Sequence, residues 1–278
     1  MPVSRIALLD GTVVDSSVPL LRADDLGVLR GDGVFETTLA VDSVPRDLDE
    51  HLARMRVSAS MVDLDLPAED GWRRAVAAVL AAGDPRQTSV RLVATRGPES
   101  GGPPTAFVTA SPLPTTTIAQ REGIRVLTLP RGFAGAEAAA APWLLAGAKT
   151  LSYAVNMATQ RYAKANDADD VIFVGTDGAV LEAPTATVVV ARDRTLATPP
   201  GDGILDGITV RRLFASAEQA GYRTVVRPVR PTELGEADGV WLASSVRLLA
   251  PVVAIDGTAR PIGPQHRELG RLLQVPAS

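Results

Sequence analysis

Lys149 is the residue of this sequence best suited to covalent chemistry on a carbonyl group. The chain contains two lysines, Lys149 and Lys164, against 26 arginines. A lysine amine can lose its proton and attack a carbonyl carbon, whereas the guanidinium of arginine stays protonated. Codon bias can also make lysine rare, so the case for Lys149 depends on the residues that accompany it.

A carboxylate and a glycine-opened helix follow Lys149 in the chain. Glu182 stands close to the fully apolar run 188–191, where a carboxylate must find a partner or stay neutral. Gly207-Ile208-Thr209 opens a predicted helix, and its backbone N–H groups, hydroxyl and dipole suit a phosphate. Simple capping of that helix is the alternative. An amine, a carboxylate and a phosphate-binding helix start are together what pyridoxal 5'-phosphate (PLP) requires.

The composition narrows the classes of function. The net charge is −4, aromatic residues make up 4%, and no basic run occurs, which argues against nucleic acid as the main partner. There is no cysteine, and the two histidines lie far apart, so we expect neither a disulfide nor a metal site. The start has no apolar signal core, and no apolar run reaches membrane-spanning length. We therefore expect a soluble cytoplasmic protein that acts on a small molecule.

The first half of the chain is predicted to form strands and two helices. Asp47 can cap a helix over 47–63, whose apolar side chains form one stripe. His51, Arg54 and Ser58 lie on another face of this helix, and we expect them at the surface. The other expected elements are a hairpin over 3–14 around Asp10-Gly11, a strand over 34–41, a helix over 68–82 that ends at Gly83, and strands over 88–96 and 105–110.

The second half is predicted to alternate strands and helices. A helix over 151–166 should turn a stripe that includes Val155 and Tyr162 toward the core. The other expected elements are strands over 124–128, 170–174, 180–182, 188–191 and 239–243, a helix opened by residues 203–209, a hairpin at Asp256-Gly257 and a helix near 264–273. The domain boundaries that we expect are an N-terminal α/β domain over 1–112, a linker over 113–120 and a C-terminal α/β domain over 121–278.

The order of these features resembles the class IV family of PLP enzymes. This family includes branched-chain and D-amino-acid aminotransferases and 4-amino-4-deoxychorismate lyase. The resemblance extends from Gly31-Asp32-Gly33-Val34-Phe35-Glu36 to Ser244-Ser245. It implies a two-domain α/β (α+β) fold of type IV with PLP in the cleft between the domains. It also implies a homodimer whose partner chain helps to close the site.

The resemblance assigns a role to each residue that matches the family pattern. Lys149 is similar to the lysine that forms a Schiff base with PLP, and Glu182 to the carboxylate that faces the pyridine nitrogen. The segment His51-Leu52-Ala53-Arg54-Met55 is similar to one whose arginine, here Arg54, binds the phosphate. The further cofactor ligands that the resemblance implies are Ile208 and Thr209 in the phosphate loop, the hydroxyl of Ser245, and Tyr153 against the ring hydroxyl.

Among the members, the chain looks most like the lyase, which converts 4-amino-4-deoxychorismate to 4-aminobenzoate and pyruvate in folate biosynthesis. The carboxylate-trapping arginine and histidine of D-amino-acid aminotransferases are replaced by Gly101 and Pro103, although some lyases also carry an arginine near Gly101. Thr187 stands where the family often has an asparagine. Candidate substrate-binding residues are Arg30, Phe35, Arg96 and Arg247.

Two other functions stay open at this point. One is a class IV aminotransferase that acts on D-amino or branched-chain amino acids. The other, from a different class, is a non-catalytic protein whose glycine turns hold a nucleotide.

Overall fold

The computed structural model describes residues 5–82 and 86–276, and the chain divides into two units. The first unit comprises Met1–Pro114 and Ala148–Tyr153, and the second comprises Thr115–Gly147 and Ala154–Ser278. Lys149 therefore belongs to the first unit as part of the short segment Ala148–Tyr153, although the chain before and after this segment belongs to the second unit. Residues 113–120, which we expected to be a linker, contain helix α4 (Thr115–Ala119).

The first unit is built on a six-stranded antiparallel sheet with strand order β2-β1-β6-β5-β3-β4. Its elements are β1 (Arg5–Leu8), β2 (Val13–Val14), α1 (Leu26–Leu29), β3 (Gly33–Val41), β4 (Val44–Pro45), α2 (Leu48–Ser60), α3 (Glu69–Ala81), β5 (Thr88–Thr95) and β6 (Thr105–Pro112). The predicted hairpin, strands and two long helices are confirmed within the described residues. Helix α1 was not expected, and Gly83, the predicted end of α3, lies outside the described residues.

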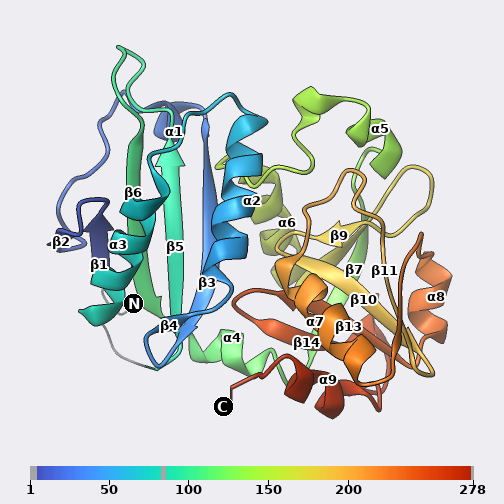
Figure 1. Cartoon of the computed structure of the whole chain (residues 1–278). Helices are drawn as coiled ribbons and strands as arrows, with labels where there is room; N and C mark the ends of the chain where they lie inside the picture. Colours follow the sequence, from blue (N-terminus) through green and yellow to red (C-terminus); the bar gives the residue numbers. More distant parts are fainter. Residues whose placement is uncertain (1–4, 83–85, 277–278) are drawn as a thin grey trace. The chain divides into compact units, whose positions relative to one another are not determined.

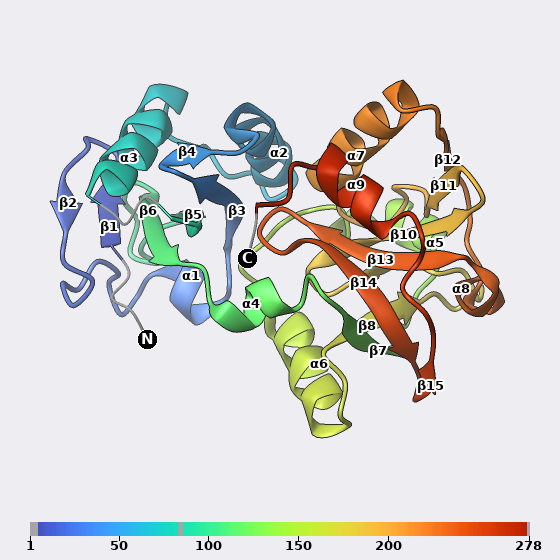
Figure 2. The same ribbon diagram turned by 90° about the horizontal axis from the view of Figure 1, so that it is seen from below.

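Helices α2 and α3 lie against one face of this sheet (Figures 1 and 2). Met55 of α2 and Trp72 of α3 are buried in a shared core with strand residues such as Leu92. The prediction that Asp47 caps α2 is wrong, because its backbone is left-handed with φ of 50° and its side chain makes no capping hydrogen bond. Acidic side chains in the first turn still complement the positive end of the helix dipole.

The second unit is built on a nine-stranded mixed sheet with the main order β12-β11-β10-β13-β14-β7-β8. Besides α4, its elements are β7 (Ile124–Pro130), α5 (Gly135–Ala139), the 3-10 helix η1 (Pro142–Leu144), α6 (Ala154–Ala165), β8 (Asp170–Val174), β9 (Glu182–Ala183), β10 (Ala186–Arg192), β11 (Thr195–Thr198), α7 (Ile208–Gln219), β12 (Arg223–Val226), α8 (Pro231–Glu236), β13 (Gly239–Ser244), β14 (Leu248–Ile255), β15 (Thr258–Ala259) and α9 (His266–Leu272). Strands β11 and β12 and helix α8 were not expected.

Strand β10 shows why residues 188–191 are all apolar. Val188 and Val190 belong to one buried cluster, which also contains Leu234 of α8. Val189 belongs to a second cluster with Leu213 of α7 and residues of α9. Because successive side chains of a strand point to opposite faces, a strand that is covered on both faces needs an unbroken apolar run.

The predicted core-facing stripe of α6 is wrong. Val155 is 57% exposed and Tyr162 is 53% exposed, and the buried residue of this helix is Ala163. Helix α6 packs against β8, which is the last strand of the sheet order. The contact of α6 with this edge strand buries Ala163, and the larger apolar side chains of the helix remain exposed.

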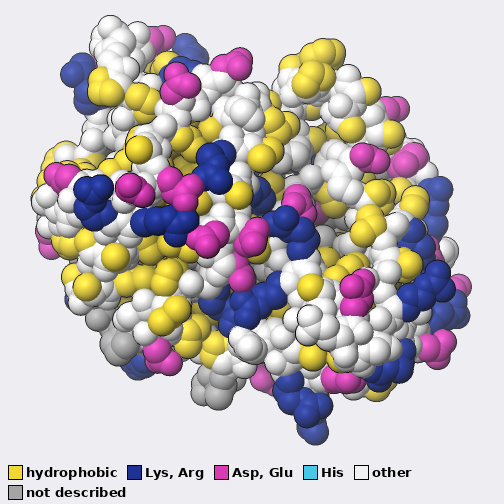
Figure 3. All heavy atoms as spheres, viewed as in Figure 1, with side chains coloured by type: hydrophobic (Ala, Val, Ile, Leu, Met, Phe, Trp, Pro, Cys, Tyr) yellow, Lys and Arg dark blue, Asp and Glu magenta, His cyan; other side chains and the backbone are white. Residues whose placement is uncertain are grey.

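Charged side chains of both signs are intermixed on the face of the molecule shown in Figure 3. This mixture is consistent with the small net charge of −4. Over the described parts of the chain, the helices are too short or too polar to cross a lipid bilayer.

Candidate active site

Lys149 is held against β3 by hydrogen bonds of its own peptide groups and its neighbours. The N–H of Phe35 donates to the carbonyl of Lys149 at 3.0 Å, and the N–H of Leu151 donates to the carbonyl of Gly33 at 2.9 Å. The N–H of Lys149 donates to Oγ of Ser58 on α2 at 3.0 Å. These bonds explain why this short segment joins the first unit.

The crossing of this segment over β3 requires a glycine at position 33. A Cβ atom there would lie 2.4 Å from the carbonyl oxygen of Ala94 and 2.7 Å from the side chain of Leu151. Both distances are far below ordinary van der Waals contact. The last glycine of the Gly31-Asp32-Gly33 turn therefore permits the approach of the lysine segment.

The amine of Lys149 lies beside two aromatic rings. Its Nζ is 4.6 Å from the ring centre of Phe35 and 5.9 Å from that of Tyr153. The two rings meet edge to face, with 5.3 Å between their centres. An aromatic face attracts a cation and gives the amine an apolar surrounding. Three residues predicted for the site thus meet at one place in the first unit.

A buried carboxylate orders the polar face of α2. Glu36 on β3 is fully buried and accepts two hydrogen bonds from Arg54, both at 2.7–2.8 Å. Its Oε2 also lies 2.7 Å from Nδ1 of His51. Burial disfavours the charged carboxylate, yet the hydrogen bonds from Arg54 and His51 outweigh burial and hold the pKa of Glu36 at about 2.

The expectation that His51, Arg54 and Ser58 lie at the surface is wrong. His51 is 1% exposed, Ser58 is fully buried, and the side chain of Arg54 is 11% exposed. Their face of α2 is polar because it packs against the Glu36 carboxylate and the Lys149 peptide rather than against solvent. A helix can therefore bury two different faces when one of them meets a charged partner.

Two of the arginines proposed for substrate binding are engaged elsewhere in the structure. Arg96 forms an ion pair with Asp32 at 2.6 Å and donates to backbone carbonyls that follow α2. Arg247 is 6% exposed and pairs with the buried carboxylate of Asp170 at 2.9 Å. Arg30 is exposed at the end of α1.

Arg91 is a residue of this region that sequence reasoning missed. The carbon at the centre of its guanidinium lies 5.6 Å from the ring centre of Phe35, the same ring that lies beside the Lys149 amine. Arg91 on β5 lies opposite Thr37 on β3, so their side chains point to the same face of the sheet. Phe35 is two residues before Thr37 on β3, so its side chain also points to that face. The sequence signal that could have identified Arg91 is its positive charge within a predicted strand, 88–96, that is otherwise largely apolar.

The second unit carries the predicted carboxylate and helix start. Oε2 of Glu182 accepts a hydrogen bond from the N–H of Leu205 at 3.2 Å, and Glu182 is the register partner of Thr187 on β10. The side chain of Thr187 in turn packs against Gly207, where a Cβ would lie 2.4 Å from its Oγ1. Thr187 therefore brings Glu182 near the N-terminus of α7.

Helix α7 begins with a glycine cap followed by two buried residues, Ile208 and Thr209. The first N–H groups of an α-helix have no partner within the helix. Because Gly207 has no side chain, its position cannot supply the usual capping oxygen to them. Such N–H groups, at the positive end of the helix dipole, suit an anion such as a phosphate.

Ser245 lies in the turn between β13 and β14, and buried arginines hold this turn. Arg121 donates to the carbonyls of Arg247 at 3.0 Å and of Val246 at 3.3 Å. The ion pair between Arg247 and Asp170 then ties the turn to the first residue of β8. Arg247 thus supports the turn that carries Ser245.

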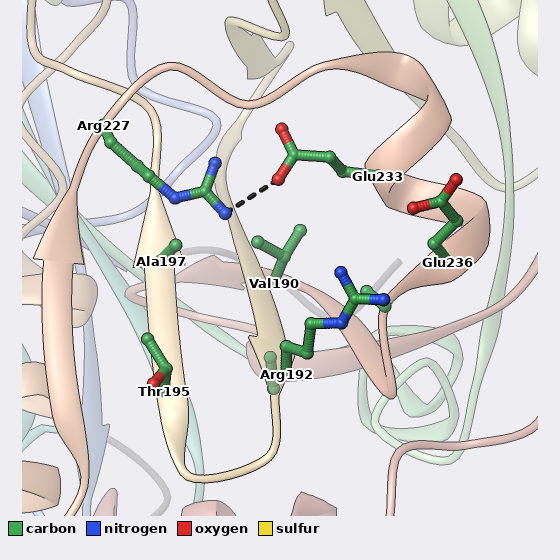
Figure 4. Close-up of a pocket in the computed structure, with 9 residues that line it drawn as sticks. Val190, Arg192, Thr195, Ala197, Arg227, Glu233 and Glu236 are labelled. Carbon is green, nitrogen blue, oxygen red and sulfur yellow. Dashed lines mark ion pairs between the residues drawn. The ribbon is translucent and has the colours of Figure 1, made fainter.

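A polar pocket lies at the other end of β10 (Figure 4). Arg227 and Glu233 form an ion pair of 2.7 Å in it, and this pair lowers the pKa of Glu233. Its lining residues include none of the predicted site residues. In the described parts of the chain, no group of acidic, histidine or cysteine side chains is arranged to hold a metal ion.

The family model for class IV aminotransferases matches residues 33–255. The chain therefore belongs to the class IV aminotransferase family. PLP is the cofactor of this enzyme family, and the fold is that of the type IV PLP enzymes.

Similar proteins and solved structures support this assignment. The chain is 44% identical to a bifunctional aminodeoxychorismate lyase and D-amino acid transaminase of Mycobacterium tuberculosis, over 93% of this chain and 94% of that protein. It is 43% identical to a structure described as a hypothetical aminotransferase of the same organism in its PLP-bound form, with a TM-score of 0.94 and coverage of 98% and 97%. A fold IV transaminase of Curtobacterium pusillum is 40% identical, with a TM-score of 0.91 and coverage of 97% of each chain.

The residues present fit the chemical needs of PLP. An aldehyde needs an amine, a pyridine nitrogen needs a carboxylate, and a phosphate needs N–H donors and a cation. Lys149 offers an amine, and Arg54 offers a cation. Glu182 offers a carboxylate, and the glycine-capped start of α7, where Thr187 leaves no room for a Cβ, offers N–H donors.

The low pKa of Glu36 predicts a pH-dependent contribution to stability. Its pKa falls from 4.5 to about 2 on folding, so the stabilisation is present above pH 4.5 and is lost as the pH falls toward 2. At pH 7 the Glu36→Gln variant should unfold with a free energy about 3 kcal/mol lower than that of the wild type. Urea unfolding at several pH values measures this difference, which should narrow below pH 4.5.

The matched control is Glu69→Gln, which removes an exposed carboxylate that also pairs with two arginines. Solvent screens exposed ion pairs, so they contribute little to stability and this variant should unfold much like the wild type. A Glu36→Gln deficit that stays constant from pH 7 to pH 3 would show that the charge of Glu36 is not the stabilising feature.

Proposed function

We propose that the protein is a PLP-dependent lyase that converts 4-amino-4-deoxychorismate to 4-aminobenzoate and pyruvate, a step of folate biosynthesis. The observation that carries this proposal is the Phe35 ring, which has the Lys149 amine at 4.6 Å and the Arg91 guanidinium at 5.6 Å from its centre. The substrate bears its amine and a carboxylate at opposite ends of one six-membered ring. The Mycobacterium tuberculosis relative, whose name includes this lyase activity, supports the same reaction.

The groups that would hold the cofactor are those that match the family pattern. When bound, PLP supplies a ring that accepts electrons from the substrate carbon next to the amine. We assign Glu182 to the pyridine nitrogen, because a carboxylate keeps that nitrogen protonated. The other groups that we assign are Arg54 and the N–H groups of Ile208 and Thr209 to the phosphate, with Ser245 as a further hydroxyl ligand and Tyr153 against the ring hydroxyl.

Lys149 would act as the base of the reaction. Its Nζ takes the proton from the substrate carbon that carries the amino group. The bond from the neighbouring ring carbon to the enolpyruvyl oxygen then breaks, and the six-membered ring becomes aromatic. The departing enolpyruvate takes up a proton and becomes pyruvate. All atoms come from one substrate and solvent protons, so neither a keto acid nor an oxidant is consumed.

Arg91 would bind the carboxylate at the far end of the substrate ring. Guanidinium pairs with carboxylate through parallel N–H bonds, which fix orientation as well as position. Arg96 and Arg247 are less suited to this role, because Arg96 also donates to two backbone carbonyls and Arg247 is only 6% exposed. Phe35 would lie between the lysine and Arg91 and contact the flat substrate ring.

A D-amino acid transaminase activity is the second candidate. It is favoured by the same Mycobacterium tuberculosis relative, which is named for both activities. Lys149 would then move a proton between two carbons instead of allowing an elimination. Gly101 and Pro103 occupy the places of the carboxylate-trapping pair, so Arg91 would have to bind the amino-acid carboxylate.

We also propose that the enzyme works as a cytoplasmic homodimer. The exposed apolar side chains of α6, among them Val155, Met157 and Tyr162, offer a surface that a second copy could cover. The absence of cysteine is compatible with a reducing compartment. Measurement of the molecular mass of the protein in solution shows whether it is a dimer.

Purified enzyme supplied with 4-amino-4-deoxychorismate should release 4-aminobenzoate and pyruvate in equal amounts without a keto acid. Lys149→Arg should retain the positive charge and lose at least about 1000-fold in rate, because a guanidinium cannot act as the base. Liquid chromatography of both products measures the reaction, and a panel of D- and L-amino acids with 2-oxoglutarate measures transamination.

Lys164→Arg is the control, since Lys164 is exposed in the last turn of α6. It should turn over like the wild type. Amino transfer without any release of 4-aminobenzoate would reject the lyase in favour of the transaminase. Full activity of Lys149→Arg would reject both.

Replacement of Arg91 by glutamine should weaken substrate binding. The loss of one charged hydrogen-bonding partner predicts a KM about ten- to hundredfold higher, with a smaller change in kcat. Initial-rate kinetics measures both constants. The exposed Arg74 on α3 provides the control, because Arg74→Gln removes the same charge from the same unit. Equal KM values for the two variants would show that Arg91 does not bind the substrate.

A further inference from the structure

The peptide of Lys149 is held on both of its sides. Its carbonyl accepts from the N–H of Phe35 on β3, and its N–H donates to the side-chain oxygen of Ser58 on α2, each at 3.0 Å. The first of these bonds belongs to the pairing of the segment with β3, in which Thr150 is the bridge partner of Val34. The second comes from a side chain, so a single substitution can remove it.

Ser58 belongs to the same helix face as Arg54. The two residues are four positions apart, which separates them by about 6 Å along the axis and leaves them on one side of the helix. Arg54 is fixed by its two hydrogen bonds to the buried Glu36. One rigid helix therefore carries both the cation that we assign to the phosphate and the oxygen that receives the Lys149 N–H.

We infer that Ser58 is a positioning residue, whose hydroxyl oxygen keeps the Lys149 backbone at a fixed position relative to Arg54 on α2. This inference rests on the proposed role of Lys149. The lysine side chain has four flexible carbons, and its amine must leave the cofactor and return to it in every turnover. A fixed backbone limits the positions that the amine can occupy, so the amine reaches the cofactor aldehyde more often in a reactive geometry.

The alternative is that Ser58 only fills space in the core. It is fully buried, so packing alone could account for a serine at this position. The two roles differ in the effect that loss of the oxygen should have. A filling role predicts a change in stability, whereas a positioning role predicts slower covalent attachment of PLP to Lys149 in a protein that is still folded.

The test compares Ser58→Ala with Ser60→Ala, a control on the same helix whose exposed hydroxyl bonds to the carbonyl of Val57. Apoprotein of each variant is mixed with PLP, and the absorbance change on covalent attachment is followed in time at several pH values. Thermal unfolding of the apoproteins and steady-state kcat and KM complete the set. The attachment rate does not depend on which substrate the enzyme uses.

For Ser58→Ala we expect attachment and kcat to fall about tenfold, with KM within about twofold of the wild type. Ser60→Ala should match the wild type. Ser58→Cys, which fills the site with a slightly larger side chain but offers only a weak acceptor, should resemble Ser58→Ala rather than the wild type.

Attachment at the wild-type rate in Ser58→Ala would overturn the inference, and so would a normal rate in Ser58→Cys. If Ser58→Ala does not fold, Ser58→Cys alone decides between the two roles. A wild-type protein that never attaches PLP would instead contradict the proposed function.

Discussion

Backbone hydrogen bonds between the lysine segment and β3 are the constraint on which the rest of the site depends. Because of these bonds, Lys149 belongs to the first unit, beside Phe35, although most of the chain around it in sequence belongs to the second unit. Glycine at position 33 makes this close approach sterically possible. The same strand carries Glu36, whose buried charge orders the polar face of α2. One strand thus positions the Lys149 amine, the aromatic ring beside it and the carboxylate that holds Arg54.

The elements with strong local signals were predictable from the sequence. Helix α3 and strand β3 form almost at their expected bounds, because an apolar period and flanking turn residues specify each of them locally. The turn at Asp256-Gly257 also joins two paired strands, as its dipeptide indicates. Lys149 could be selected because its chemistry is not interchangeable with that of arginine.

The surroundings of these elements were not predictable, because they depend on contacts between residues far apart in sequence. The polar face of α2 looked like a solvent face, and only the position of Glu36 on β3 shows that it is buried. Arg247 looked available for substrate, yet Asp170 pairs with it from a strand 77 residues away. Strands β11 and β12 pair in parallel across the intervening helix α7, so no short turn signals their pairing.

The covalent attachment of PLP to one of two lysines tests the central claim most directly. Reduction of the PLP-loaded enzyme with borohydride fixes the cofactor to the lysine that holds it. Digestion and mass spectrometry then identify the labelled peptide. We expect the phosphopyridoxyl group on the peptide that contains Lys149 and none on the peptide that contains Lys164. A label on Lys164, or a fully unlabelled protein, would contradict the account.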